Sequence, residues 1–279
     1  MPQTDLVTRA DTFRALHLAG GLILPNAWDV ASARIVEAAG FPAVATSSAS
    51  VAFARGFRDD GSIGRDAMLR EVALIASRVS VPVSADVEAG YGPTLADVEA
   101  TVAGVIAAGA VGINLEDAIP GGAPAPLFGL EDAAGRVATA RATAERLGVP
   151  IVINARTDPF LLALGDSDEE RLAIAVERGR AYLAAGADIV FVPGVRDPAL
   201  VRRLADGIGG PLSLMVGPGA PPAAELFAAG ARRISLGPHT MLAALGTLRA
   251  IAGEARRSGT WTELGRQHIP FGEVESLMG

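Results

Sequence analysis

The stretch AAGAVGINLED, residues 107–117, contains the unit from which this chain is built. Ala107-Ala108-Gly109 ends a helical segment, because glycine accepts the left-handed backbone conformation that closes a helix. The short apolar run Gly112–Asp117 follows, and it has the length of a strand that is covered on both faces. The same Ala-Ala-Gly ending precedes an apolar run at 38–40, 184–186 and 228–230. Helix and strand therefore alternate along the chain.

Eight apolar runs predict eight strands, at Leu22–Ala27, Ala43–Ser48, Val81–Glu88, Gly112–Asp117, Ile151–Thr157, Ile189–Gly194, Leu212–Val216 and Arg233–Pro238. Amphipathic segments predict helices at about 29–39, 65–79, 94–108, 130–147, 168–185, 197–207, 221–229 and 239–257, with a short one near 260–267. This alternation favours an α/β fold of the (β/α)8 TIM barrel type, with a doubly wound open sheet as the alternative. No linker divides the chain, so we expect residues 1–279 to form a single domain with a C-terminal extension over about 258–279.

The composition excludes several kinds of chemistry. All 24 basic residues are arginine, and the chain has neither lysine nor cysteine. Without lysine there is no Schiff-base aldolase, lysine-bound pyridoxal phosphate or phosphate-loop lysine. Without cysteine there is no thiolate nucleophile, disulfide or metal–thiolate site. The net charge of −7 disfavours nucleic-acid binding, which requires a basic face.

No targeting or membrane segment is evident. The first residues include acidic side chains and no apolar core of signal-peptide length. No later stretch reaches the roughly 18 uninterrupted apolar residues of a membrane-spanning helix. We therefore expect a cytoplasmic protein that binds neither membrane nor nucleic acid.

Acidic residues gather at the carboxyl ends of the predicted strands, where barrel enzymes hold their active sites. Alternation along a strand puts Asp86 and Glu88 on one face, and Glu116 ends the neighbouring strand. Carboxylates this close repel one another unless a cation neutralises them. Oxygen ligands favour Mg²⁺, or else Mn²⁺, over zinc. We predict a metal site here; the alternative is that these acids cap helices or pair with arginine.

Candidate substrate-binding groups lie at two other strand ends. Arg156 ends an apolar strand, and a guanidinium binds carboxylate or phosphoryl groups through paired hydrogen bonds. We favour substrate anchoring by Arg156 over the alternative that it only balances the acids. Ser47, Ser48 and Ala49 offer hydroxyl and backbone N–H groups to a carboxylate, although serines at such a turn also cap helices. The expected ligand is a small carboxylate.

An ordered set of motifs runs through nearly the whole chain: NAWD (26–29), TSSAS (46–50), FRDD (57–60), DVEAGYG (86–92), NLED (114–117) and NARTD (154–158). This set resembles the isocitrate lyase/phosphoenolpyruvate mutase superfamily. The resemblance implies a (β/α)8 barrel whose last helix is exchanged with a neighbouring subunit, a homotetramer, and Mg²⁺ at the mouth. It also implies a 2-oxo or 2-hydroxy acid substrate that is cleaved through an enolate.

The resemblance further implies how the acids share the metal. Asp86 corresponds to the acid that contacts the metal, and Glu88 and Glu116 correspond to acids that reach it largely through water. Asp59 corresponds to the loop acid that supports this water shell.

Roles toward the substrate follow from the same resemblance. Ser47, Ser48 and Ala49 correspond to the segment that holds the substrate carboxylate, and Arg156 to the arginine that steadies the reacting oxyanion or carboxylate. Mg²⁺ chelated by a 2-oxo acid stabilises a developing enolate and eases cleavage of the C–C or C–P bond beyond it. Arg156 and Asp59 are therefore candidate catalytic residues, and Tyr91 is the third.

The loop after the fourth strand departs from the superfamily pattern. It reads AIPGGAPAPLFG, residues 118–129, and contains no ionisable side chain. Isocitrate and methylisocitrate lyases carry Lys-Lys/Arg-Cys-Gly-His there, and that cysteine exchanges a proton with the carbanion. The phosphonate-processing members place Asn or Thr in this loop and often a histidine after the sixth strand, where this chain has Pro193. We expect protonation by water or by a hydroxyl such as that of Tyr91, which alternatively only packs.

These observations predict a Mg²⁺-dependent lyase that cuts a C–C bond of a 2-oxo or 2-hydroxy carboxylate, with oxaloacetate-like or substituted malate-like compounds as candidates. Two alternatives stay open. One is a C–P enzyme, a phosphonopyruvate hydrolase or phosphoenolpyruvate mutase. The other is a barrel that binds metal and ligand but has lost catalysis.

Overall fold

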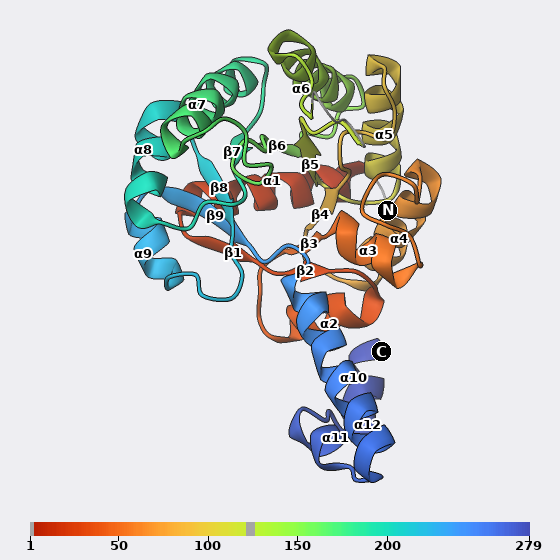
Figure 1. Ribbon diagram of the computed structural model, residues 1–279. Coiled ribbons are helices and arrows are strands. Elements are labelled where there is room, and N and C mark those ends of the chain that lie inside the picture. The colour runs from red at the N-terminus through yellow and green to blue at the C-terminus, as the bar shows by residue number, and fades with distance from the viewer. Residues whose placement is uncertain (1–2, 121–125) are drawn as a thin grey trace.

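The computed structural model describes residues 3–120 and 126–279, and its strands form a parallel barrel (Figure 1). The strands are β1 (Leu22–Leu24), β2 (Asn26–Ala27), β3 (Val44–Thr46), β4 (Val83–Asp86), β5 (Gly112–Glu116), β6 (Val152–Arg156), β7 (Ile189–Phe191), β8 (Leu212–Met215) and β9 (Ala231–Ser235). β1 and β2 are two halves of the first predicted run, separated by Pro25. Because β1 pairs with β9 and β2 pairs with β3, this interrupted strand completes the ring. The predicted (β/α)8 barrel is confirmed.

The helices are α1 (Gln3–Ala19), α2 (Val30–Ala38), α3 (Ser48–Ala54), α4 (Arg65–Arg78), α5 (Leu95–Ala107), α6 (Leu130–Arg146), α7 (Asp168–Ala184), α8 (Pro198–Ile208), α9 (Ala223–Ala228), α10 (His239–Ser258), α11 (Thr262–Arg266) and α12 (Phe271–Met278). The nine predicted helices are confirmed, each to within two residues at either end. Local capping explains several of these ends. At the start of α2, for example, the backbone N–H of Ser32 donates to the Asp29 carboxylate at 2.7 Å.

Parallel register brings residues of different strands to one level of the barrel. Asp86 of β4 is the partner of Asn114 of β5, which is in turn the partner of Asn154 of β6. Two residues further toward the carboxyl ends of β5 and β6, Glu116 is the partner of Arg156. Because registered residues of parallel strands face the same side, these side chains share the barrel interior.

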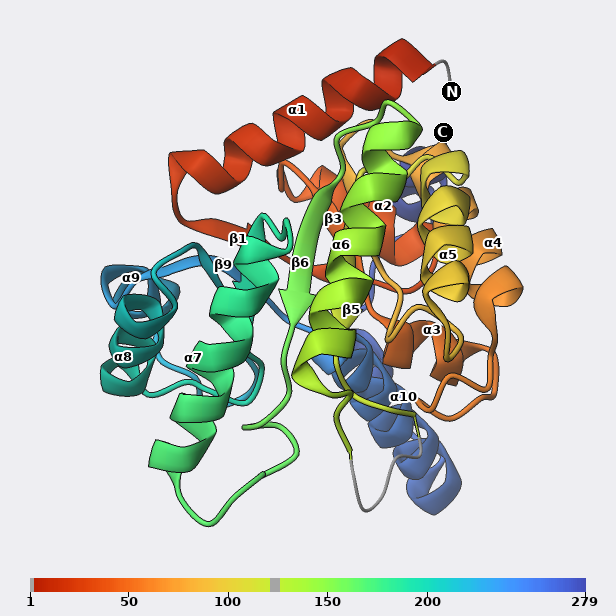
Figure 2. The same cartoon turned by 90° about the horizontal axis from the view of Figure 1, so that it is seen from above.

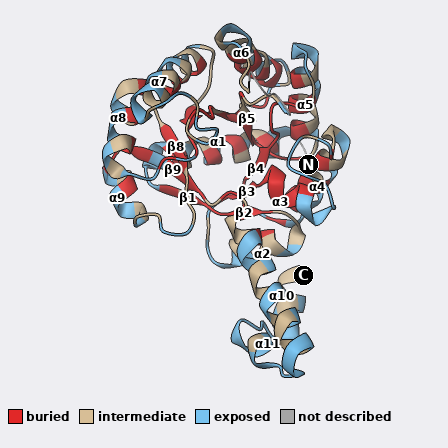
Figure 3. Ribbon diagram, viewed as in Figure 1, coloured by how far each residue is buried: buried red, intermediate tan, exposed pale blue. Residues whose placement is uncertain are grey.

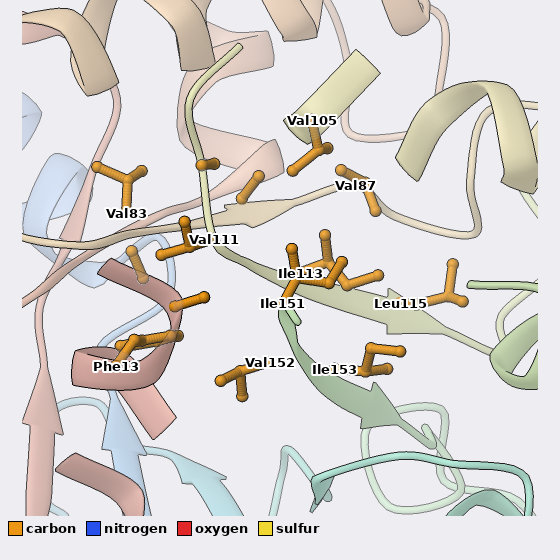
Figure 4. Close-up of a cluster of buried hydrophobic side chains, with 14 of the residues drawn as sticks. Phe13, Val83, Val87, Val105, Val111, Ile113, Leu115, Ile151, Val152 and Ile153 are labelled. Carbon is orange, nitrogen blue, oxygen red and sulfur yellow. The ribbon is translucent and has the colours of Figure 1, made fainter. Parts of the chain in front are cut away.

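The alternate residues of the same strands form the hydrophobic layer beneath the helices. Ile113 and Leu115 of β5 and Ile153 of β6 are buried, and Figure 4 shows them with Val105 of α5 in one cluster. Burial is concentrated on the strands and on the inner faces of the surrounding helices (Figure 3). This layer fixes the strands, so that the opposite face is free to carry polar groups.

Helix α1, which the sequence analysis missed, lies across the end of the barrel that is opposite to the carboxyl ends (Figure 2). Its buried residues, Leu6, Ala10, Phe13 and His17, recur every three or four positions. Phe13 is fully buried and lies against Gly112, where a side chain would meet the aromatic ring. Polar residues between these positions dilute the apolar pattern, and for that reason the helix was not recognised.

The C-terminal arm, residues 239–279, projects away from the barrel (Figures 1 and 3). Helix α10 begins beside β2 and continues outward, and α12, also missed from the sequence, packs against α2. Large apolar side chains of the arm are exposed, among them Leu248 at 60%, Trp261 at 66% and Phe271 at 76%. Within the described residues, none of the helices has both the length and the apolar character needed to cross a membrane.

Candidate active site

A cavity of about 220 Å³ opens at the carboxyl ends of the strands. Its walls come from most strands of the barrel, and it is lined by Asn26, Ser47, Ser48, Ala49, Asp59, Asp86, Asn114, Arg156, Leu161, Phe191, Met215, Ser235, Gly237 and Pro238. Six of the nine predicted site residues are therefore together in one cavity. We call this space the central cavity.

Asp86 is the buried carboxylate of the central cavity, with 7% of its surface exposed. Its Oδ2 accepts hydrogen bonds from the backbone N–H and the hydroxyl of Ser48, each at 2.9 Å. Its backbone N–H donates to the Thr46 hydroxyl at 2.8 Å. These contacts hold the carboxylate in one orientation, while Oδ1 is buried and has no hydrogen-bond partner among the described residues.

The serine segment forms the start of α3, a helix that the sequence analysis did not predict. Ser47 caps this helix by accepting a hydrogen bond from Ser50 N–H at 3.3 Å. Ser48 donates to Asp86, and Ala49 completes the wall. Helix capping, which was the alternative role for these serines, is thus found at Ser47. Ser48 instead orients the carboxylate of Asp86. Contact between this segment and a substrate carboxylate stays a prediction.

Asp59 reaches the central cavity from the loop between α3 and α4. Asp59 is an exposed residue that lines one edge of the cavity, and the partial desolvation of its carboxyl group, together with the negative charge of Asp86, raises its pKa. Asp59 therefore lies where the sequence analysis expected the loop acid.

Glu88 and Tyr91 lie elsewhere than alternation predicted. The strand ends at Asp86, and Glu88 and Tyr91 have positive φ values of 48° and 53°. Since the chain leaves the extended conformation, the rule that places Asp86 and Glu88 on one face no longer applies. Glu88 and Tyr91 instead line a neighbouring pocket of about 370 Å³, which we call the side pocket.

The side pocket keeps Glu88 in an unusual electrostatic state. Burial raises the pKa of Glu88 to about 7, and the negative charges of Asp86 and Asp59 add to that shift. Burial and the charge of Glu88 also raise the pKa of Tyr91. The Tyr91 hydroxyl therefore stays protonated at neutral pH, and no described residue accepts a hydrogen bond from it.

Glu116 is held by an ion pair with Arg156 and does not line the central cavity. Arg156 Nη1 lies 2.7 Å from Glu116 Oε2, and Arg156 Nε donates to Asp158 Oδ1 at 2.7 Å. Burial raises the pKa of Glu116, and the adjacent guanidinium opposes that shift. The two carboxylates stabilise the charged form of Arg156 and raise its pKa. Arg156 is thus balanced by acids and also lines the central cavity, and substrate anchoring by Arg156 stays a prediction.

The sequence analysis missed three polar residues of the site. Asp158 orients Arg156, and Asn114 lines the central cavity. Asn26 ties the barrel closure together, because its Oδ1 accepts from the backbone N–H groups of Leu236 and Gly237 at 2.9 and 2.7 Å. All three lie in the quoted motifs, yet a single sequence does not show which motif residues face the site.

The carboxylates fit a hydrated cation better than a bare one. Within residues 3–120 and 126–279, no three His, Cys, Asp or Glu side chains are close enough together to hold a metal ion. Asp86 Oδ1 and Glu88 Oε1 are nevertheless buried without a hydrogen-bond partner in the described residues. The charges of Asp59, Asp86, Glu88 and Glu116 also act on one another. Mg²⁺ usually keeps several of its water ligands in proteins. A site with one carboxylate that contacts the ion, and with further carboxylates that bind its waters, therefore suits Mg²⁺.

Comparison with known proteins identifies the family of this chain. The family model described as phosphoenolpyruvate phosphomutase matches residues 13–256. A crystal structure from Burkholderia cenocepacia J2315, described as a lyase/mutase, has a TM-score of 0.91 and 36% identity and covers 98% of this chain and 96% of its own. Oxaloacetate decarboxylase of Rhodopseudomonas palustris (strain BisB5) is 30% identical over 90% of this chain and 86% of its own.

A solved complex of phosphonopyruvate hydrolase with oxalate and Mg²⁺ is 27% identical, with a TM-score of 0.82, and covers 96% of this chain and 94% of its own. The chain therefore belongs to the phosphoenolpyruvate phosphomutase family. This family is part of the isocitrate lyase/phosphoenolpyruvate mutase superfamily, and the relatives named above are enzymes of that superfamily.

Proposed function

We propose that this protein is a Mg²⁺-dependent lyase that cuts a C–C bond of a 2-oxo or 2-hydroxy carboxylate, with oxaloacetate-like or substituted malate-like compounds as substrates. One observation carries the proposal. The buried carboxylate of Asp86, with one oxygen free, lines the same central cavity as the guanidinium of Arg156. A cation-binding acid and an anion-binding arginine in one small cavity match a small carboxylate chelated to a metal.

Asp86 would hold the metal directly, and Asp59, Glu88 and Glu116 would bind its water shell. When bound, Mg²⁺ supplies a Lewis acid that stabilises negative charge on the oxygens of a 2-oxo acid. Ser48 keeps the metal-facing oxygen of Asp86 in place, because both of its hydrogen bonds go to the other oxygen. Mn²⁺ is expected to substitute for Mg²⁺, since both take oxygen ligands.

Arg156 has one donor group left for the substrate. Its Nη1 and Nε serve Glu116 and Asp158, whereas Nη2 has no hydrogen-bond partner among the described residues. We propose that Nη2 donates to the carboxylate or to the oxygen on which charge develops. Because two acids fix the plane of the guanidinium, this donor needs no reorganisation during the reaction.

The source of the proton is the point on which this chain departs from the lyases of the superfamily. Residues 121–125 of the loop 118–129 lie outside the described residues, and no residue of the whole loop is ionisable. Tyr91 lies in the side pocket with a raised pKa, so it is a weak acid. We therefore favour reactions whose carbanion takes its proton from water, such as decarboxylation or retro-Claisen or retro-aldol cleavage.

The test is a turnover assay on oxaloacetate, methylisocitrate, dimethylmalate and phosphonopyruvate, with and without EDTA, that follows the release of pyruvate and, from oxaloacetate, also of oxalate and acetate. We expect turnover of at least one C–C substrate and loss of that turnover in EDTA. The similarity to phosphonopyruvate hydrolase makes a C–P enzyme the second candidate. Turnover of phosphonopyruvate alone would overturn the C–C assignment, and oxalate binding without any turnover would identify a binding barrel.

We further propose that the C-terminal arm contacts a second copy of the chain and contributes to a homotetramer. Exposed leucines on one helix, Leu242, Leu245 and Leu248, support this assembly. Light scattering is expected to give a tetramer, and Leu248→Asp is expected to reduce its mass. Leu18→Asp, at an even more exposed leucine on α1, is the control. A cytoplasmic location stays a prediction, and cell fractionation tests it.

A further inference from the structure

Asn114 has a place in the central cavity that the mechanism above does not use. It lies on β5 between Asp86 of β4 and Asn154 of β6, at one level of the barrel. Only 5% of its surface is exposed, and it lines the central cavity together with Asp86 and Arg156. Its side chain is thus close to the groups that are proposed to bind the metal and the substrate.

The amide oxygen of Asn114 is fully engaged by two residues that do not line the central cavity. Its Oδ1 accepts a hydrogen bond from Asn154 Nδ2 at 2.7 Å and another from Arg233 Nη2 at 3.1 Å. A carbonyl oxygen has two lone pairs, so these two bonds saturate it. The amide nitrogen of Asn114, by contrast, has no acceptor in the described part of the chain.

Arg233 decides which way the Asn114 amide points. An asparagine amide can rotate to exchange its oxygen and nitrogen, and Asn154 could rotate with it. A guanidinium has only donors, so it cannot face the NH₂ group of Asn114 without leaving both groups unpaired. Arg233 therefore holds the oxygen of Asn114 toward the barrel core and its NH₂ group toward the cavity.

Packing does not account for Arg233. The residue is fully buried on β9, and none of the ion pairs in the described residues includes it. Its Nε and Nη1 have no hydrogen-bond partners there either. The negative charge of Asp86 acts on Arg233 without a direct ion pair between them in the described residues. A buried charge without a directly paired carboxylate is costly, and an apolar side chain of similar length would fill the space without that cost.

We propose that Asn114 is a substrate-binding residue whose NH₂ group donates to an oxygen of the bound carboxylate, and that Arg233 is a positioning residue that acts through Asn114. This inference rests on the proposed function, because it takes a small chelated carboxylate as the ligand. It adds a neutral donor to the charged donor of Arg156, which lies on the neighbouring strand β6. The ligand is then held by two groups whose orientation is fixed before it binds.

The experiment measures oxalate binding in the presence of Mg²⁺ by calorimetry, and oxaloacetate turnover separately. The variants are Asn114→Ala, Arg233→Met and the double variant. Ser213→Ala is the matched control, because Ser213 is fully buried beside Arg233 and its hydroxyl also lacks a partner in the described chain. Thermal unfolding of each variant checks that the barrel is intact.

We expect Asn114→Ala to weaken oxalate binding about 10- to 100-fold, as for the loss of a hydrogen bond to a charged ligand. Arg233→Met is expected to weaken it about 10-fold in the wild-type background and less than about twofold in the Asn114→Ala background. Additive losses would overturn the positioning role of Arg233. Should Arg233→Met fail to fold, Arg233→Gln is measured in the same cycle.

The outcomes separate this inference from the proposed function. Unchanged oxalate affinity of Asn114→Ala, in a protein that turns over oxaloacetate, would overturn the inference and leave the function intact. Weakened oxalate binding in that variant, together with no turnover of any C–C substrate by the wild type, would support the inference and overturn the function. Absence of oxalate binding by the wild type would overturn both.

Discussion

Arg156 and Glu116 face each other at the same level of neighbouring strands, with Arg156 Nη1 2.7 Å from Glu116 Oε2. Asp158 binds the Nε of the same guanidinium from the loop that follows. Glu116 and Asp158 therefore fix the orientation of the Arg156 guanidinium, and its Nη2 is the donor group that these two acids leave unused. Its chemistry depends on geometry as much as on charge.

This relationship predicts that charge alone cannot replace Arg156. Arg156→Lys keeps the positive charge but cannot bond two acids and a ligand in one plane, so kcat/KM is expected to fall about 100-fold or more. Steady-state kinetics on the best substrate of the panel measures the loss. Arg203→Lys, at a surface ion pair with Glu169 on the outer helices, is the control and is expected to have no effect. Equal activity of both variants would contradict the assignment.

Removal of the Asp86 carboxylate is expected to abolish metal binding without unfolding the protein. Asp86→Asn is predicted to weaken Mg²⁺ binding at least about 100-fold, and Ser48→Ala, which loses one orienting hydrogen bond, about 10-fold. Calorimetric Mg²⁺ titration measures both values. Asp206→Asn makes the same aspartate-to-asparagine change at an exposed position of α8 and serves as the control. Wild-type Mg²⁺ affinity in Asp86→Asn would place the metal elsewhere.

His17 predicts an acid-sensitive component of stability. Burial, helped by the positive charge of Arg233, lowers the pKa of His17 from 6.5 to about 4. The unfolded chain binds this proton below about pH 6.5 and the folded chain does not, so the contribution to stability is lost as the pH falls from 6.5 toward 4. A shift of that size corresponds to about 3 kcal/mol.

The measurement is denaturant unfolding of the wild type and of His17→Gln between pH 7 and pH 4.5. The wild type is expected to lose more stability than His17→Gln over this range. His268→Gln, at an exposed histidine of the C-terminal arm, should follow the wild type. Parallel pH curves for the wild type and His17→Gln would show that His17 is not the group responsible.

The contact between α1 and the barrel predicts a packing defect. A Cβ at Gly112 would lie 2.5 Å from Phe13 Cε1, so Gly112→Ala is expected to destabilise the fold by about 1–3 kcal/mol. Phe13→Leu in the same chain should recover part of that loss, because it removes the ring atom in conflict. Gly135→Ala on α6, where a Cβ meets nothing within 4 Å, should be neutral or stabilising. Thermal unfolding compares the three variants.

The local sequence was sufficient for the strand–helix order and for most of the site. The Ala-Ala-Gly ends and buried runs are local signals, since glycine geometry and burial periodicity act over a few residues. The position of Asp86 followed from its place at a strand end. Helix α1 was missed because polar residues dilute its apolar pattern, and the contacts that hold it on the barrel, such as that of Phe13 with Gly112, join residues about a hundred positions apart.

The sequence by itself therefore determined the barrel, the family and a set of acids with one arginine at the carboxyl ends of the strands. Only the tertiary structure decided which of those side chains line the central cavity, which line the side pocket and which pair with each other. Glu88 leaves the strand in a left-handed conformation and lines the side pocket, and Glu116 pairs with Arg156. Arg233 reaches Asn114 across the barrel. These side-chain pairs form because the barrel closes and brings strands that are far apart in the sequence close together. No local sequence pattern encodes which of those residues will meet.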